Sequence, residues 1–232
     1  MDKLKHSTVI VVDVLRATTS IIWAVKNGAK QVIPAQDENT AFAYATKMGL
    51  EDSVLAGERG GLKIDGFQLG NSPQSFESRN IWKKNVIIST TNGTNAINMS
   101  RGAKHLLIGA MINRSAVAIR ALEYGGDIII VCAGTDNKDS ADDMCAAGAI
   151  CEAIRRFSAV DVVPNDMALV CTLLYCNWDK GQADLADTFH CARLIRLGFK
   201  DDVEFCLKRD MTAVVPEFIN ESIIRVDAPT FL

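Results

Sequence analysis

The stretch VIVVDVLRATTSI, from Val9 to Ile21, determines how the rest of the chain is interpreted. It begins with a run of β-branched apolar residues, which is typical of a strand buried on both faces of a sheet. The run stops at Asp13 and Arg16, and small hydroxylated residues then open a predicted helix over 17–27. A buried strand that ends in charged residues predicts a functional site at the edge of the sheet.

The same alternation of strand, polar turn and helix continues along the chain. Predicted strands cover residues 8–12, 31–35, 53–56, 85–89, 105–109 and 127–131, and another is predicted at 212–215. Predicted helices cover residues 17–27, 39–48, 95–100, 113–124, 142–157, 164–175, 183–197 and 202–207. This pattern predicts an α/β fold with a mainly parallel or mixed sheet flanked by helices. Residues 1–232 form either one α/β unit or two closely packed lobes with a boundary near residue 160.

Composition and charge argue against several classes of protein. The chain has 232 residues, a net charge of −3 and no basic run, so nucleic acid is not an expected partner. No apolar stretch is long enough to span a bilayer, and the N-terminus lacks the features of a signal peptide. We therefore expect a cytoplasmic protein without a membrane partner. Apolar helical faces after Pro164 fit a homo-dimer or an ordinary core equally well.

The cysteines indicate a reducing compartment. There are seven, an odd number, and their spacing is irregular, without a CxxC pair. Buried reduced thiols are therefore expected, and a structural zinc site is not.

Four predicted strands end in polar clusters. Asp13 and Arg16 follow the first strand, and the third runs into GERGG, which contains Glu58 and Arg59. TTNGT follows the strand at 85–89, and CAGTDNKDS follows the strand at 127–131. Because ligands bind beyond the carboxyl ends of parallel strands, we expect these clusters on one edge of the sheet.

The residue types in these clusters suit a small, highly anionic ligand. Arg16 and Arg59 can each bind a phosphate or carboxylate through two parallel hydrogen bonds. A glycine-containing turn before a helix exposes backbone N–H groups to an anion. The hard oxygen ligands that suit Mg²⁺ are Asp13, Glu58, Asp142 and Asp143. The other candidate binding residues are Asn71, Ser72, Thr91, Asn92, Gly93 and Thr94.

Each feature also has a structural interpretation. Asp13 could cap the following helix, Glu58 and Arg59 could form an exposed ion pair, and TTNGT could be a simple turn. Acidic residues at 142–143 are favoured at a helix start by the helix dipole alone. Cys132 could be a small buried hydrophobe rather than a nucleophile, and His190, on an apolar helix, is interpreted as structural.

Signatures of the common phosphate-handling proteins are absent from the sequence. There is no P-loop GxxxxGK[ST]. Lys138 stands six residues after Cys132, where a thiol phosphatase needs arginine, and Leu15 stands two residues after Asp13, where a haloacid-dehalogenase-type enzyme needs a second aspartate. The residues alone therefore lead to an α/β protein with a Mg²⁺-dependent anion site.

The order of the motifs resembles the 2-phosphosulfolactate phosphatase family. The matching blocks are VDVLRATTSI, GERGG, GFQLGNSP, TTNGTNAI, and CAG with a downstream DDMCAAG. The later stretch LGFKDDVEFCLKRDMTAVVPEF is similar too, so the resemblance covers nearly the whole chain. It implies an α/β fold distinct from the common phosphatase folds, and a Mg²⁺-dependent acid phosphatase of coenzyme M biosynthesis. Such an enzyme hydrolyses 2-phospho-3-sulfolactate to 3-sulfolactate and phosphate.

The resemblance places all the candidate residues above at or near the site. One departure is Asp142-Asp143, where the family often has Glu-Asp. We expect Mg²⁺ on Asp13, Glu58 and Asp143, the phosphoryl group on Arg16 and the TTNGT amides, and the acid groups on Arg59, Asn71 and Ser72.

The attacking group and the substrate are open at this point. An activated water, Asp13 and Cys132 are the three candidate nucleophiles, in that order. A phosphatase for other 2-hydroxy acid phosphates and a non-catalytic binding protein for small organic anions are the alternative functions.

Overall fold

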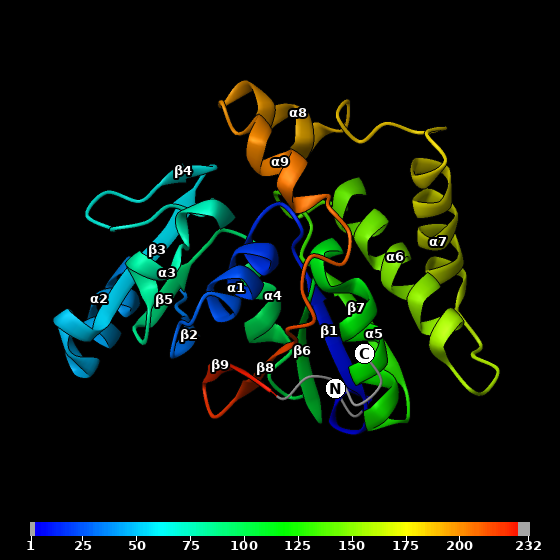
Figure 1. Cartoon of the computed structure of the whole chain (residues 1–232), viewed down its shortest axis with the longest axis horizontal. Coiled ribbons are helices and arrows are strands. Elements are labelled where there is room, and N and C mark those ends of the chain that lie inside the picture. Colours follow the sequence, from blue (N-terminus) through cyan, green and yellow to red (C-terminus); the bar gives the residue numbers. More distant parts are fainter. Residues whose placement is uncertain (1–2, 227–232) are drawn as a thin grey trace.

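The computed structural model describes residues 3–226 and consists of a nine-stranded sheet flanked by helices (Figure 1). The strands are β1 Thr8–Val12, β2 Gln31–Pro34, β3 Ser53–Arg59, β4 Leu62–Lys63, β5 Asn85–Ser89, β6 His105–Gly109, β7 Ile128–Cys132, β8 Pro216–Ile219 and β9 Ser222–Arg225. The helices are α1 Ala17–Lys26, α2 Glu38–Met48, α3 Ser78–Ile81, α4 Gly93–Met99, α5 Arg114–Tyr124, α6 Ala141–Phe157, α7 Asp166–Asp179, α8 Phe189–Arg196 and α9 Lys200–Cys206. Short 3₁₀ turns lie at Leu4–His6, Leu50–Asp52, Pro73–Ser75 and Met111–Asn113.

The sheet contains two parallel groups of strands joined by a hairpin. Its strand order is β4-β3-β5-β2-β9-β8-β6-β1-β7. Strands β3, β5 and β2 run parallel to one another, and so do β6, β1 and β7. The pairings β2–β9, β9–β8 and β8–β6 are antiparallel. The predicted α/β fold with a mixed sheet is therefore confirmed.

The hairpin β8–β9 changes the expected geometry of the site. The successive antiparallel steps reverse the strand direction between the two parallel groups, so no single parallel sheet carries all the polar clusters. Each group of parallel strands instead contributes the carboxyl ends of its own strands to the site. Strand twist accumulates across a sheet of this width and turns the two groups relative to one another.

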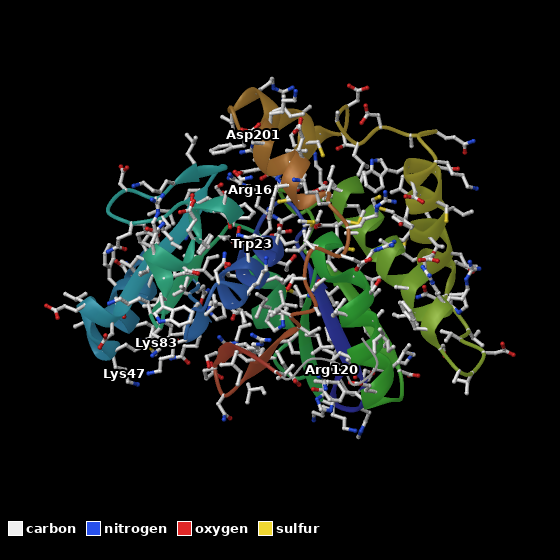
Figure 2. All side chains as sticks on the ribbon, viewed as in Figure 1. Arg16, Trp23, Lys47, Lys83, Arg120 and Asp201 are labelled. Carbon is white, nitrogen blue, oxygen red and sulfur yellow. The ribbon has the colours of Figure 1, made fainter. Side chains whose placement is uncertain are left out.

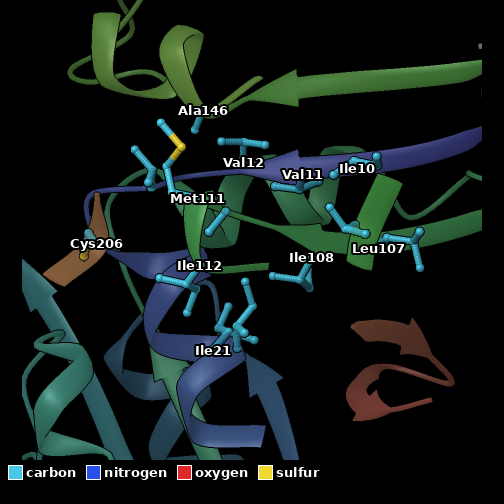
Figure 3. Packing of buried hydrophobic residues seen from close by; sticks show 14 of the residues in the cluster. Ile10, Val11, Val12, Ile21, Leu107, Ile108, Met111, Ile112, Ala146 and Cys206 are labelled. Atoms are coloured by element: carbon cyan, nitrogen blue, oxygen red, sulfur yellow. The ribbon is translucent and has the colours of Figure 1, made fainter. Parts of the chain in front are cut away.

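The core is centred on β1, which is buried along its whole length. Figure 3 shows Ile10, Val11 and Val12 packed beside Leu107 and Ile108 of β6. Helices α4, α5 and α6 contact β1, and this cover explains why its sequence is continuously apolar rather than alternating. The rigid strand ends at the position from which Asp13 enters the site.

The C-terminal part differs most from expectation. The predicted strand at 212–215 is wrong, because the strand β8 begins at Pro216. The Thr212 N–H donates to the Ile112 carbonyl, and the Asn113 side chain donates to the Val214 carbonyl, so this segment is bound to the turn after β6 instead of a neighbouring strand. The helix predicted at 183–197 is shorter, since α8 covers only Phe189–Arg196.

Other predicted elements agree in type with the structure, and several agree in their bounds. The boundary near residue 160 stays a prediction. Within residues 3–226, no helix is both long enough and apolar enough to cross a lipid bilayer. All seven cysteines are free thiols, and four of them are buried, as expected from the sequence.

Candidate active site

One pocket lies where the carboxyl ends of β1, β3, β5 and β7 meet, with α8 on one side. Residues from both parallel groups of strands therefore share it, although the sheet is not parallel throughout. Its polar and charged lining residues are Asp13, Arg16, Glu58, Asn71, Thr91, Asn92, Thr135, Asp136, His190 and Arg193.

Asp13 forms the buried floor of the pocket. The Ala17 N–H donates to Asp13 Oδ1 at 3.3 Å, and the Asp13 N–H donates to Thr18 Oγ1 at 3.1 Å, so the residue also helps to start α1. A Cβ on Gly93 would lie 2.7 Å from Asp13 Oδ2 and 2.5 Å from Ala17 Cβ. Glycine is therefore required at position 93, because α4 begins directly against this carboxylate.

The surroundings of Asp13 favour its neutral form. Burial raises the pKa of Asp13 to about 7, and the charges of Glu58 and Asp142 also raise it. His190 and the Ala17 N–H act in the opposite direction. A carboxyl group with this pKa can exchange a proton near neutral pH.

Glu58 joins the ends of two strands. Its Oε1 accepts a hydrogen bond from the Thr91 N–H at 2.8 Å, and its Oε2 accepts one from the Gly61 N–H at 2.7 Å. The carboxylate thus fixes the TTNGT turn against the GERGG turn, and it lies within the pocket lining.

Asp142 and Asp143, at the start of α6, lie behind the lining. Asp143 accepts hydrogen bonds from the Val14 N–H at 2.8 Å and the Gly134 N–H at 2.9 Å. Burial raises the pKa of Asp143 well above its usual value, and the charges of Asp142 and Asp13 raise it further. Asp142 accepts a hydrogen bond from the Ser140 hydroxyl, and its Oδ2 lies 3.1 Å from His190 Nδ1.

His190 enters the pocket from α8, held by Asp142. Burial lowers the pKa of His190, but the hydrogen bond and charge of Asp142, together with the charge of Asp13, outweigh burial and raise it above the usual value. The sequence-based interpretation of His190 as structural did not anticipate this position. The sequence contains only a weak indication that His190 belongs to the site, because a single histidine on an apolar helix is typical of core packing.

Arg16 lines the pocket but is bound tightly within the protein. Its Nη1 donates to Asp202 Oδ2 at 2.7 Å, and its Nη2 donates to the Gly61 carbonyl at 2.6 Å. Its guanidinium carbon lies 4.1 Å from the centre of the Phe199 ring. Figure 2 shows Arg16 just below the segment that carries Asp201. The neighbouring Asp202, which binds Arg16, was not predicted from the sequence as a residue of the site.

The predicted substrate-binding residues are divided between the pocket and its surroundings. Arg59 is outside the lining, and its guanidinium contacts Glu38 Oε1 at 3.0 Å, Ser89 Oγ and the Glu58 carbonyl. The Ser72 hydroxyl donates to Asp202 Oδ1 at 2.6 Å. Asn71 lines the pocket, and its buried Oδ1 has no hydrogen-bond partner among residues 3–226.

The TTNGT turn is partly used by the protein itself. The Thr91 N–H binds Glu58, and the Thr94 N–H lies 3.2 Å from Thr90 Oγ1. Asn92 lines the pocket, whereas Gly93 and Thr94 lie behind it. The Asn92 amide is therefore the better candidate for contact with an anion.

The acidic residues do not form a closed protein cage for a metal. No group of three or more His, Cys, Asp or Glu side chains within residues 3–226 is arranged to hold an ion. The residues do fit Mg²⁺ in another manner, because that ion commonly retains waters and binds through one or two carboxylates and substrate phosphate. The unpartnered Asn71 Oδ1 supports this fit, since it offers a buried oxygen in the lining that contains Asp13 and Glu58.

Cys132, at the end of β7, is a poor nucleophile in this setting. Burial raises the pKa of the Cys132 thiol far above its usual range, and the charge of Asp143 acts in the same direction. The thiol therefore stays protonated at neutral pH, whereas nucleophilic cysteines need the thiolate.

The chain is similar to known proteins along nearly its whole length. A family model described as 2-phosphosulpholactate phosphatase matches residues 1–221. The probable 2-phosphosulfolactate phosphatase of Caldicellulosiruptor saccharolyticus is 40% identical, over 97% of this chain and 94% of the relative. Relatives of the same name from Caldanaerobacter subterraneus and Clostridium novyi are 38% and 36% identical, each over 94% of this chain and over 90% and 91% of their own lengths. The chain therefore belongs to the 2-phosphosulpholactate phosphatase family.

Proposed function

We propose that this protein is a Mg²⁺-dependent phosphatase that hydrolyses 2-phospho-3-sulfolactate to 3-sulfolactate and phosphate. The observation that carries the proposal is the pocket. In it the buried carboxyl group of Asp13 lies with polar residues from the strand ends and with His190 and Arg193 of α8. Membership of the family supports the choice of substrate.

Asp13 is the group that handles the proton of the attacking water. Asp13 follows β1 and lines the pocket, so its carboxylate is available to accept a proton from a water that attacks the phosphoryl group. The same position allows Asp13 to act as a covalent nucleophile, which is the alternative. Cys132 is the weakest candidate because its thiol is not ionised.

Cationic groups and amides stabilise the phosphoryl group. Arg16 has five N–H donors, and its bonds to Asp202 and Gly61 leave others for a phosphate oxygen. The amide of Asn92, at the start of α4, adds a further donor. His190, whose pKa is raised above its usual value, is placed to donate a proton to the departing ester oxygen.

Mg²⁺ would be held by Asp13 and Asn71. Glu58, whose two oxygens accept hydrogen bonds from the Thr91 and Gly61 amides, would position the two turns beside them. Asp142 and Asp143, which we expected as ligands from the sequence, have their oxygens engaged by His190, Ser140 and backbone amides, so their part is to orient neighbouring groups. When bound, the ion would neutralise phosphate oxygens and so stabilise charge in the transition state.

The wider setting follows from the family resemblance. We propose a cytoplasmic enzyme of coenzyme M biosynthesis that acts on a small anionic phosphate ester, without nucleic acid. Exposed apolar residues on α7, such as Met167, Val170 and Leu173, support a homo-dimer. Sedimentation velocity would show whether the protein sediments as a monomer or a dimer.

Phosphate release tests the proposal. We would compare 2-phosphosulfolactate, 2-phospholactate and phosphoglycolate, each with Mg²⁺ and with EDTA. Mg²⁺-dependent release that favours the sulfonate supports it. Equal release from all three esters would support phosphatase activity but contradict 2-phosphosulfolactate as the specific substrate. No release from any ester would favour a binding protein for small organic anions.

A further inference from the structure

Two arginines line the pocket, and only one of them can move to meet a ligand. Arg16 is 2% exposed and is bound by Asp202, by the Gly61 carbonyl and by the Phe199 ring. Its charge is compensated inside the protein before any substrate enters. A group held in this manner can donate a hydrogen bond but cannot reposition itself.

Arg193, on α8, lies in the outer part of the same pocket. Its Nη1 donates to Asp136 Oδ2 at 3.0 Å, and the two side chains are 33% and 53% exposed. Asp13 and Glu58, by contrast, are only 6% and 8% exposed, which places them deeper. Exposed ion pairs contribute little to stability, so a ligand anion can replace Asp136 without disturbing the fold.

Two turns, one at Gly60 and one at Asp136, lie beside the Arg193 guanidinium. Gly60, in the GERGG turn, faces this guanidinium, and a Cβ there would lie 3.5 Å from Arg193 Nη2. Asp136 lies in a tight turn closed by hydrogen bonds between Thr135 and Lys138, with a φ of 52°. The carboxylate of Asp136 is thus held by its own loop next to Arg193.

We propose that Arg193 binds the sulfonate of the substrate and that Asp136 occupies this position when no substrate is present. This inference rests on the proposed function and identifies the residue that selects the substrate. The sulfonate is one carbon farther from the ester-bearing carbon than the carboxylate, so with the phosphate at Asp13 it reaches farther outward. A guanidinium matches two sulfonate oxygens through parallel N–H donors.

The test compares two esters in wild type and variants. 2-Phosphosulfolactate and 2-phospholactate share the phosphate and the carboxylate, and only the first carries a sulfonate. We expect Arg193→Gln to lower the ratio of their kcat/KM values at least about tenfold, mainly through the KM of the sulfonated ester. Arg193→Lys keeps the charge but loses the paired donors, and we expect it to lie between Arg193→Gln and wild type.

Two further variants separate this role from a general effect of charge. Arg196→Gln removes the same charge from the same helix, but Arg196 is exposed and outside the pocket lining, so the ratio should stay at its wild-type value. Asp136→Asn removes the competing carboxylate and should lower the KM of the sulfonated ester. An equal loss for both esters in Arg193→Gln, or no loss for either, would overturn the inference.

Binding measurements distinguish failure of this inference from failure of the proposed function. Calorimetric titration with 3-sulfolactate and with lactate requires no turnover. If wild type releases phosphate from neither ester, the proposed function fails, yet weaker 3-sulfolactate binding by Arg193→Gln than by wild type and Arg196→Gln would still support the sulfonate contact. Equal 3-sulfolactate binding by all three proteins would contradict it.

Discussion

The two walls of the pocket are built in opposite ways. On the β1 side, Arg16 and Asp202 form an ion pair whose side chains are 2% and 6% exposed. On the α8 side, Arg193 and Asp136 form an ion pair with a similar N–O distance, and their side chains are 33% and 53% exposed. The buried pair fixes the geometry around the reacting group, whereas the exposed pair can exchange one anion for another. One pocket can therefore combine a rigid catalytic floor with an adjustable entrance.

The largest expected effect concerns Asp13, at the buried floor of the pocket. Asp13→Asn removes the proton-accepting oxygen while keeping its shape and neutral form, and we expect kcat to fall about 10³-fold. Circular dichroism should show unchanged secondary structure. Phosphate release within a few-fold of wild type would mean that Asp13 is not the reacting carboxylate.

The buried ion pair should dominate stability. Asp202→Ala leaves the Arg16 guanidinium buried without its charged partner, and we expect the free energy of unfolding to fall by about 3 kcal/mol. Asp136→Ala, the matched change on the exposed wall, should cost less than about 1 kcal/mol. Urea unfolding of both variants measures the difference, and similar losses would remove the contrast between the walls.

Asp13 should also make stability depend on pH in an unusual direction. The folded state keeps the Asp13 proton up to about pH 7, whereas the unfolded state loses it near the ordinary pKa of 3.8. Between these values the folded state binds more protons, so this residue's contribution to stability falls as pH rises. In EDTA at pH 8, Asp13→Asn should be more stable than wild type by as much as about 4 kcal/mol.

Thermal and urea unfolding at pH 5 and pH 8 provide the control for this linkage. The gain from Asp13→Asn should shrink at pH 5, where the folded wild type is protonated at this site. A gain independent of pH would show that another cause, such as local packing, is responsible.

The smallest effect is expected at Cys132. Because its thiol is protonated and only partly accessible, Cys132→Ala should change kcat by less than about twofold, and iodoacetamide at pH 7.5 should react slowly with this residue. Mass spectrometry of the alkylated peptides measures that reaction. Loss of turnover in a folded Cys132→Ala variant would contradict this expectation and make Cys132 a candidate nucleophile again.

The sequence was most informative about the strands on either side of the site. Short apolar runs marked Thr8–Val12, Asn85–Ser89 and His105–Gly109 with the bounds that the structure has. Buried strands of this type leave little ambiguity, because apolar runs bounded by turn signals identify them directly. The polar residues after Thr8–Val12 and Asn85–Ser89 were likewise expected at one site, and Asp13, Thr91 and Asn92 share the pocket.

The hairpin in the middle of the sheet could not be predicted. Its strands contain four residues each, and its turn contains Asn220 and Glu221 with positive φ values instead of an Asn-Gly pair. Its insertion between β2 and β6 joins segments far apart in the sequence. The local pattern contains no information about that pairing.

The α8 side of the site was missed for a related reason. Helical periodicity placed His190 and Arg193 on a helix but could not show what that helix covers. The position of this region depends partly on Asp202, which accepts hydrogen bonds from Arg16 and Ser72. These bonds hold the neighbouring helix α9 against the end of β1. Such contacts connect residues more than a hundred positions apart and depend on the completed fold.

A crystal structure of the Asp13→Asn variant with 2-phosphosulfolactate and Mg²⁺ would test the central claim most directly. We predict the phosphate beside residue 13 and the Asn92 amide, and the sulfonate on Arg193, with Asp136 displaced. A ligand bound outside this pocket, or one bound inside it with the sulfonate on Asn71 or Ser72 and Asp136 still on Arg193, would contradict the account.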